Sequence, residues 1–254
     1  LVVLASGWSH RPKKGEGRAG HDPPAHPLLP WICRSGDGGR TWTQEGTILP
    51  PEGGPDRVIP FGDVVRLTDG ALGACIYSFQ RPDVRVCSFY ASADDGRTWA
   101  VRGVIAAGIN ETAPLALPNG ELLACARTVG DQHLELYRSV DDGRTWARVQ
   151  PVSHGSQHPG HLANLADGRV LLTYGDRREG HQGIETRISA DAGRTWSDPA
   201  RLVELEPADL GYPATVQCDD GSLVSAWYSR GVAAHQRYHM GAAVWEIEEL
   251  FPTS

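Results

Sequence analysis

The hydrophobic residues of this chain occur in short runs that are interrupted by glycine, asparagine and aspartate. Runs such as LELYR, ELLACAR and RVLLTYG are rich in leucine, β-branched and aromatic residues, and turn-forming residues flank them. This pattern is typical of short β-strands. Helical spacing is missing over most of the chain, and VWEIEELF near its end is also expected to be a strand. The pattern predicts an all-β protein.

Two kinds of hairpin signal alternate along the chain. The first is an Asp-Gly or Asn-Gly pair between two hydrophobic runs, which favours a two-residue hairpin turn; these pairs are Asp69-Gly70, Asn119-Gly120, Asp167-Gly168 and Asp220-Gly221. The second is the box S-x-D-x-G-x-T-W, which begins at Ser35, Ser92, Ser139 and Ser189. Its aspartate can accept backbone N–H bonds across a turn, its glycine can adopt a positive φ, and its tryptophan can bury a large surface.

The boxes recur about every fifty residues, an interval that is typical of β-propeller blades. One hairpin plus one box hairpin gives four antiparallel strands per repeat, and the repeats fall near 58–105, 109–150, 158–203 and 210–250. The opening LVVLASG resembles the second strand of a blade that lacks its first. We therefore expect a six-bladed propeller of four-stranded blades that is incomplete at its N-terminus, with five blades as the alternative. Residues 1–254 would form one domain whose first blade is partial.

Composition narrows the function classes. The chain has 31 acidic and 24 basic residues, a net charge of −7, and no cluster of lysine and arginine. A nucleic-acid partner is therefore not expected, and no apolar run is long enough for a membrane-spanning helix. The five cysteines form no C-x-x-C pair, and four of them lie in apolar, strand-like runs, so we expect small buried apolar side chains rather than metal ligands or disulfides. The chain starts without Met, so its compartment stays open between secreted, periplasmic and cytoplasmic; a monomer is expected.

Alignment of the repeats on their turn glycines brings out two positions. The position ahead of the turn holds, in successive repeats, Phe61, Glu111, Pro159 and Tyr212. The position after the turn holds Tyr77, Arg127, Gly175 and Tyr228. Inner strands of a propeller line its central channel, so Glu111, Arg127 and Tyr212 are expected at one end of the hub, the centre of the ring.

The four boxes and the segments NETAPLALPNGELLACAR and DLGYPATVQCDDG resemble the sialidase (neuraminidase) superfamily, and in particular bacterial sialidase-like Asp-box (BNR) repeat proteins. The resemblance implies that the boxes are structural. It assigns Tyr212 as nucleophile, Glu111 as the base that takes its proton, and Arg127 as a ligand of the substrate carboxylate. A neutral tyrosine avoids the repulsion that a carboxylate nucleophile would exert on an anionic sugar, and a planar guanidinium binds a carboxylate bidentately.

Further site residues follow from the same resemblance. The general acid would be Asp22, in the loop GWSHRPKKGEGRAGHDPPAHPLLPW, with His21 and His26 beside it as alternatives. A third family arginine is replaced by His181 at its usual position, so Arg177 or Arg178 in YGDRREG is expected to contact the substrate instead. His161, with Tyr212 and Arg177, could serve a lyase that removes a proton beside a uronate carboxylate.

These observations predict a retaining exo-α-sialidase that cleaves terminal sialic acid or a similar acidic sugar from glycoconjugates. Two alternatives stay open: a propeller lyase or other glycosidase that acts on an acidic saccharide through His161, and a glycan-binding propeller without catalysis. A carbohydrate partner is expected in each case. Neither a cofactor nor a metal is implied, because the histidines lack carboxylate or cysteine neighbours at metal-ligand spacing.

Overall fold

The computed structural model describes residues 1–9, 26–52, 54, 57–81, 84–232 and 235–252. Three antiparallel sheets have four strands, and neighbouring strands in the chain are neighbours in the sheet. The second sheet contains β6 (Val58–Arg66), β7 (Leu72–Arg81), β8 (Val84–Ser92) and β9 (Ala100–Ala107). The third contains β10 (Ile109–Ala116), β11 (Leu122–Thr128), β12 (Leu134–Ser139) and β13 (Ala147–Pro151). The fourth contains β14 (Gln157–Asn164), β15 (Val170–Asp176), β16 (Gly183–Ser189) and β17 (Ala200–Glu204).

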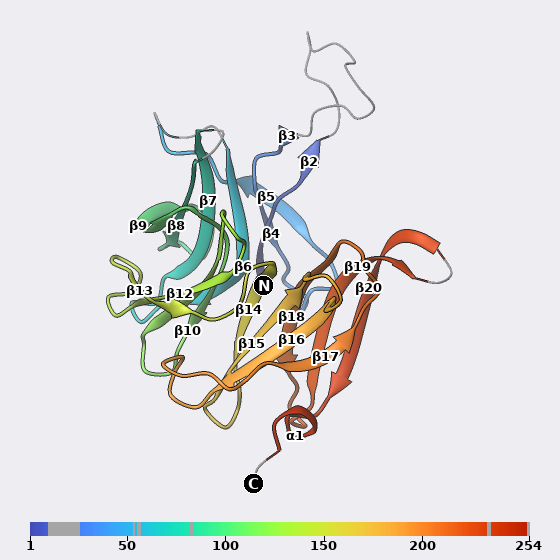
Figure 1. The fold of residues 1–254 in the computed structure, drawn as a ribbon. Helices are drawn as coiled ribbons and strands as arrows, with labels where there is room; N and C mark the ends of the chain where they lie inside the picture. Colours follow the sequence, from blue (N-terminus) through green and yellow to red (C-terminus); the bar gives the residue numbers. More distant parts are fainter. Residues whose placement is uncertain (10–25, 53, 55–56, 82–83, 233–234, 253–254) are drawn as a thin grey trace.

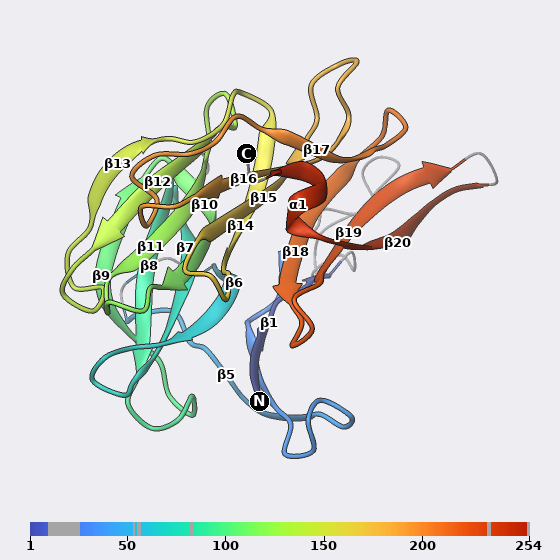
Figure 2. The ribbon, with the colours of Figure 1, turned by 90° about the horizontal axis from the view of Figure 1, so that it is seen from below.

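Two sheets at the ends of the described chain have three strands each. The first contains β1 (Val2–Ala5), β4 (Trp31–Arg34) and β5 (Thr43–Thr47), and the fifth contains β18 (Leu210–Gln217), β19 (Leu223–Val232) and β20 (His235–Trp245). A short ribbon of β2 (Trp8–Ser9) and β3 (His26–Pro27) projects from the first sheet (Figure 1). In the views of Figures 1 and 2 the sheets follow one another in chain order as the blades of a propeller.

The described residues therefore build five blades, and the prediction of six is wrong. The hairpin and box signals were located correctly, since each predicted repeat matches one sheet. The sixth blade was inferred only from the interpretation of the opening strand. No hairpin signal in the sequence supported it. The all-β propeller class itself is confirmed by the five sheets.

The prediction of a strand over VWEIEELF is also wrong in its second half. Strand β20 ends at Trp245, and Ile247–Leu250 form the one-turn helix α1. Glu248 and Glu249 lie in the first turn of this helix, where negative side chains are favourable. Ile247 packs with Trp245 in the core between the fourth and fifth blades. In the described part of the chain, no helix is long and apolar enough to cross a membrane.

The Asp-box hairpins join the last two strands of their blades. In the box at Ser139, the Asp141 carboxylate accepts bonds from the Thr145 backbone N–H (2.9 Å) and hydroxyl (2.7 Å), while the Ser139 hydroxyl accepts from the Gly143 N–H (2.9 Å). The threonine bonds lower the pKa of Asp141 to about 2. Equivalent bonds recur in the other three boxes. The serine, aspartate and threonine side chains of each box thus stabilise its own turn, while other box groups bond to the neighbouring blade, as Asp142 does to Thr68.

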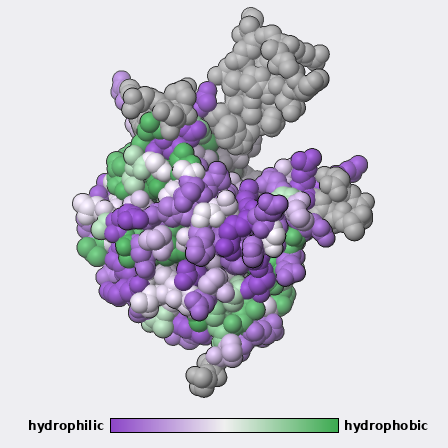
Figure 3. Space-filling view, viewed as in Figure 1, coloured by the Kyte–Doolittle hydropathy of each residue, from purple (hydrophilic) through white to green (hydrophobic). Residues whose placement is uncertain are grey.

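The core lies between neighbouring blades. Phe89 of the second blade is fully buried, and its ring lies 5.4 Å from that of Trp146 in the third blade. Similar clusters join the first blade to the second around Ile76, and the third to the fourth around Leu134 and Leu172. Because each interface is apolar, the blades hold one another in place and so fix the inner strands. On the face in Figure 3, hydrophilic residues cover most of the surface.

All five cysteines are free, in agreement with the expectation that they form no disulfides. Cys75, Cys87 and Cys125 are buried, whereas Cys218 is exposed. Burial raises the pKa of the Cys125 thiol above its ordinary range, because no charge there offsets the loss of water. The buried thiols therefore act as small apolar side chains.

Candidate active site at the hub

Three of the residues that were selected from the sequence meet at the hub. The Tyr212 hydroxyl, on β18, donates a hydrogen bond to one oxygen of the Glu111 carboxylate, on β10. Arg127, on β11, donates from Nη1 to the other oxygen of Glu111 at 2.6 Å and from Nη2 to Gln132 at 3.0 Å. The structure thus brings phenol, carboxylate and guanidinium into one contiguous cluster.

Backbone irregularities aim these side chains. The pairing of β10 with β11 shifts register between Ile109 and Thr112, around Glu111, and that of β18 with β19 shifts between Gly211 and Ala214, around Tyr212. Tyr212 has a φ of 52°, which non-glycine residues rarely adopt. A bulge turns a side chain away from the regular alternation of a strand, and here the Tyr212 and Glu111 side chains meet.

The inner strands of the second and fourth blades also contain register shifts. Strand β6 shifts register between Phe61 and Val65, around Asp63, and β14 shifts between Gln157 and Gly160, around His158. Four successive inner strands therefore contain a register shift, and the shift in β6 lies nearer its turn than the other three.

The electrostatics keep the phenols protonated. Burial, followed by the negative charge of Glu111, raises the pKa of Tyr212 well above its ordinary value. The same two causes raise the pKa of Tyr77, on β7. Tyr212 nevertheless retains 37% exposure, so a ligand can reach it. A hydroxyl of this kind reacts as a nucleophile only if a base accepts its proton during attack, and Glu111 is in contact to do so.

His158 is a hub residue that the sequence analysis did not select. It is buried, and its Nδ1 has no hydrogen-bond partner among the residues that the structure describes. Burial and the positive charges of Arg127 and Arg177 lower its pKa to about 3. His158 is thus a neutral group at the hub that feels the positive charge of both arginines.

Arg177 lies in a second cluster beside Tyr212. Its Nη1 donates to Asp209 at 2.9 Å and its Nη2 to the Tyr228 hydroxyl at 3.1 Å. The Tyr228 ring lies 5.4 Å from that of Tyr212. Asp209 was missed in the sequence, because it precedes the aligned strand and carries no motif. Tyr228 occupies the same aligned position as Arg127, a signal that could have identified it.

Arg178, the alternative to Arg177, points elsewhere. Its Nη2 lies 2.7 Å from Asp176, a buried carboxylate that also contacts Arg201 at 3.3 Å. Arg201 in turn lies 2.8 Å from Glu185. The structure places Arg178 in this internal ion-pair network of the fourth blade and does not bring it into contact with the Tyr212 cluster.

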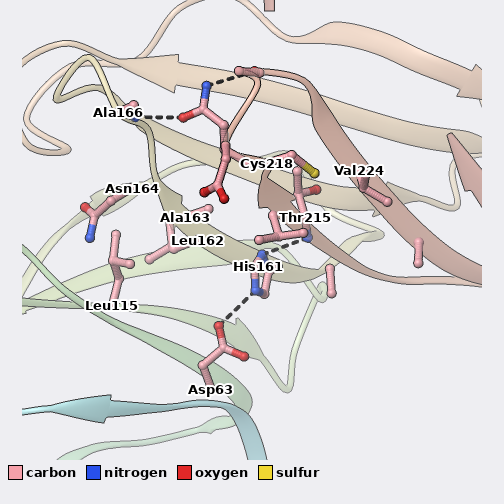
Figure 4. Close-up of a pocket in the computed structure, with 16 residues that line it drawn as sticks. Asp63, Leu115, His161, Leu162, Ala163, Asn164, Ala166, Thr215, Cys218 and Val224 are labelled. Atoms are coloured by element: carbon pink, nitrogen blue, oxygen red, sulfur yellow. Dashed lines mark hydrogen bonds and ion pairs between the residues drawn. The ribbon is translucent and has the colours of Figure 1, made fainter. Parts of the chain in front are cut away.

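His161 lies in a different cavity of about 980 Å³, which also opens at the inner strands (Figure 4). The Thr215 N–H donates to its Nδ1 at 3.3 Å, so Nε2 carries the proton and donates to Asp63 at 3.1 Å. His161 therefore bridges three blades, and both its ring nitrogens are occupied. Glu111 and Tyr212 do not line this cavity.

Asp22, the predicted general acid, and its neighbour His21 lie outside the described residues. His26 begins the short strand β3. Within the described ranges, no three histidine, cysteine or acidic side chains are grouped so that they could hold a metal ion.

The fold and the hub together define a class: a β-propeller with Asp-box hairpins on its outer strands and a tyrosine–glutamate–arginine cluster at its centre. Within that class, residues 25–224 match the family model of the BNR repeat-like domain, and the chain belongs to this family. The resemblance to sialidase-like BNR repeat proteins is confirmed. Among curated proteins, no sequence matches the chain.

Solved structures agree on the fold. A Dyadobacter fermentans protein of unknown function has 26% identity and a TM-score of 0.73, over 96% of this chain and 73% of that chain. Trypanosoma rangeli sialidase with 2,3-difluorosialic acid has 18% identity and a TM-score of 0.70, over 98% of this chain and 43% of the sialidase chain. The Fusarium graminearum α-L-arabinofuranosidase Arb93A has 18% identity and a TM-score of 0.66, over 80% of this chain and 67% of the arabinofuranosidase chain. The chain thus spans less than half the length of that sialidase.

Proposed function

We propose that the chain carries the active site of a retaining glycoside hydrolase of the sialidase type, with Tyr212 as nucleophile. The observation that supports the proposal most is the hydrogen bond from the Tyr212 hydroxyl to the Glu111 carboxylate. A phenol aimed at a carboxylate, partly exposed and next to an arginine, has the parts that a neutral nucleophile needs.

In the first half of the proposed reaction, the Tyr212 oxygen bonds to the anomeric carbon while its proton passes to Glu111. The glycosidic carbon–oxygen bond breaks, and the leaving oxygen takes a proton from a general acid, the role proposed for Asp22. In the second half, water attacks the anomeric carbon, its proton returns to the acid, and Glu111 gives its proton back to the departing Tyr212 oxygen. Two displacements retain the configuration of the sugar.

The finer proposal is a terminal sialic acid or similar acidic sugar. Arg127 supports it, because its Nη2 is held by the neutral side chain of Gln132, which a substrate carboxylate could displace. Arg177 would provide the second positive charge. The lyase alternative is supported less well, because both ring nitrogens of His161 already have partners.

Trapping the covalent intermediate tests the proposal directly. The protein is incubated with 2,3-difluorosialic acid, digested, and analysed by mass spectrometry, beside Tyr212→Phe; release of the fluorophore from an aryl α-sialoside is measured in parallel. We expect a mass increase on the Tyr212 peptide, turnover of the sialoside, and neither in the variant. Turnover that survives in Tyr212→Phe would exclude this nucleophile. A folded parent that releases nothing would rule out sialic acid, and an aryl α-L-arabinofuranoside would then test a neutral sugar.

A further inference from the structure

The loop between β11 and β12, residues 129–133, provides the second partner of Arg127. Gln132 in this loop has a φ of 62°, which non-glycine residues rarely adopt. Its side-chain oxygen accepts the 3.0 Å bond from Arg127 Nη2, while Glu111 accepts the bond from Nη1. The neutral amide thus keeps one arm of the guanidinium away from Glu111, and the orientation of Arg127 depends on what holds this loop.

An imidazole between two carboxylates lies beside Gln132. Nδ1 of His133 bonds to the Asp131 carboxylate, and its Nε2 bonds to the Glu135 carboxylate at 2.6 Å. The bond from His133 lowers the pKa of Asp131. Burial opposes the ionisation of Glu135, but Arg148 and His133 lower its pKa below the ordinary value. Because ionised carboxylates only accept hydrogen bonds, both ring nitrogens must carry protons, and His133 is an imidazolium.

The bond from His133 to Asp131 spans the residue between them, Gln132. The Thr128 N–H donates to the His133 carbonyl at 2.9 Å and closes the loop on β11, and the Thr128 hydroxyl adds a 3.2 Å bond to Asp131. An unfavourable φ persists only where surrounding contacts hold it. The contact between the side chains on either side of Gln132 therefore helps to maintain the positive φ that directs its amide.

Loss of the His133 proton would break one of the two bonds, because a neutral imidazole has a single N–H. Glu135 is the better held of the two carboxylates, since its side chain is 6% exposed and Arg148 binds both its oxygens at 2.7 Å. The Asp131 side chain is 66% exposed, so water can replace the lost bond there. Deprotonation therefore releases Asp131 and loosens the loop at Gln132.

The groups around His133 favour its charged form. In the described part of the chain they are Asp131 and Glu135, from its own loop and strand, and Arg148 of β13 lies behind Glu135. Burial lowers the pKa of His133, but the bonds to Glu135 and Asp131 raise it above the ordinary 6.5. The clamp formed by Asp131, His133 and Glu135 is therefore closed below this raised pKa and opens as the pH rises through it.

We propose that His133 is a positioning residue whose charged form holds Gln132 against Arg127, and that its deprotonation weakens the binding of an acidic sugar. The proposal rests on the proposed function, because it takes Arg127 as the ligand of the substrate carboxylate, and it adds regulation by pH. With the clamp closed, the substrate displaces a neutral amide from Nη2. With the clamp open, Nη2 can turn to Glu111, and the substrate has to displace a carboxylate, whose bond to a guanidinium is about twice as strong.

NMR of the 15N-labelled chain tests the clamp without any ligand. Both ring nitrogens of His133 should carry protons at about pH 6, and the ring should titrate above the exposed His154. The Arg127 Nε–H signal should shift over the same pH range in the parent and in the control His154→Asn, and should lose this shift in His133→Asn. A His133 ring with one protonated nitrogen at that pH, or an Arg127 signal that still titrates in His133→Asn, would overturn the proposal.

A double-mutant cycle connects the clamp to the substrate. KM for an aryl α-sialoside is measured between about pH 6 and pH 9, the range in which a raised histidine titrates, for the parent, His154→Asn, His133→Asn, Gln132→Ala and the double variant. We expect KM to rise about two- to tenfold with pH in the parent and in His154→Asn, the size of one hydrogen bond, and to be high throughout in the other three.

The double variant should match Gln132→Ala, because His133 acts through that residue. Additive effects of the two substitutions on KM, or a parent KM that does not follow the titration of His133, would overturn the positioning role. A parent that shows both NMR signatures but cleaves no sialoside would instead overturn sialidase activity and leave the clamp on Arg127 supported.

Discussion

Tyr212 and Glu111 are 101 residues apart in the chain and joined by a hydrogen bond between the phenol and the carboxylate. Each is located at a register shift in the inner strand of its blade, two blades apart. The sequence around either residue does not by itself bring the two side chains together. The packing of the third, fourth and fifth blades against one another sets the separation of the two strands, so the proposed chemistry depends on the geometry of the ring.

Replacement of Glu111 by glutamine should slow turnover while the fold persists. The amide keeps the size of the carboxylate but cannot accept the Tyr212 proton. We expect kcat to fall by about 10²- to 10⁴-fold, the usual contribution of a general base, with an unchanged circular dichroism spectrum. Retention of kcat within a few-fold would show that another group accepts the proton.

Arg127 and Arg178 form a matched pair for substitution by lysine. A lysine at position 127 cannot reach Glu111 and Gln132 together, so we expect kcat/KM on an acidic sugar to fall about ten- to a hundredfold, the value of a hydrogen bond to a charged group. Arg178→Lys alters only the network around Asp176 and should lower the melting temperature without a change in KM. Equal effects of both variants on KM would contradict the assignment of Arg127 to the site.

The free energy of unfolding should fall as the pH decreases through the range between the unfolded and folded pKa values of His158. The pKa of His158 is lowered to about 3 in the folded chain, against 6.5 for an ordinary histidine. Between these values the unfolded chain binds the proton and the folded chain does not, so the free energy of unfolding decreases as pH falls from about 6.5 to 3. His158→Gln should flatten this part of the curve, as measured by urea unfolding at several pH values. An unchanged slope would mean that His158 is already charged in the fold.

The sequence allowed the hub to be predicted where turn chemistry sets register. Alignment on the glycines of Asn119-Gly120 and Asp220-Gly221 was enough to place Glu111 and Tyr212 at equivalent positions, because turns of equal length fix the pairing of their strands. The expectation of two-residue turns was wrong, since the loops between Leu117 and Glu121 and between Cys218 and Ser222 have three residues, with only the glycine at positive φ.

Asp209 was out of reach, since it lies ahead of β18 and reaches the site only through Arg177 and two tyrosines. The sequence also could not show that Arg177 contacts Asp209 while Arg178 contacts Asp176. The two arginines are adjacent in the chain, and only the backbone conformation after β15 decides which way each side chain points.

The Asp-boxes should act by holding neighbouring blades, and Gly103 offers the sharpest test. A Cβ at Gly103, on β9, would lie 2.4 Å from the Gly143 carbonyl oxygen and 2.5 Å from that of Arg144, both in the box of the next blade. Backbone atoms cannot move aside as a flexible side chain would, so Gly103→Ala should lower the free energy of unfolding by about 1–3 kcal/mol. Gly130→Ala, with nothing within 4 Å, is the control and should change it little. If chemical denaturation gave the same free energy of unfolding for both variants, the contact between box and blade would not be needed for stability. If only Gly103→Ala lost stability, and sialoside turnover with it, the boxes would support the site by fixing the blades that carry Glu111 and Tyr212.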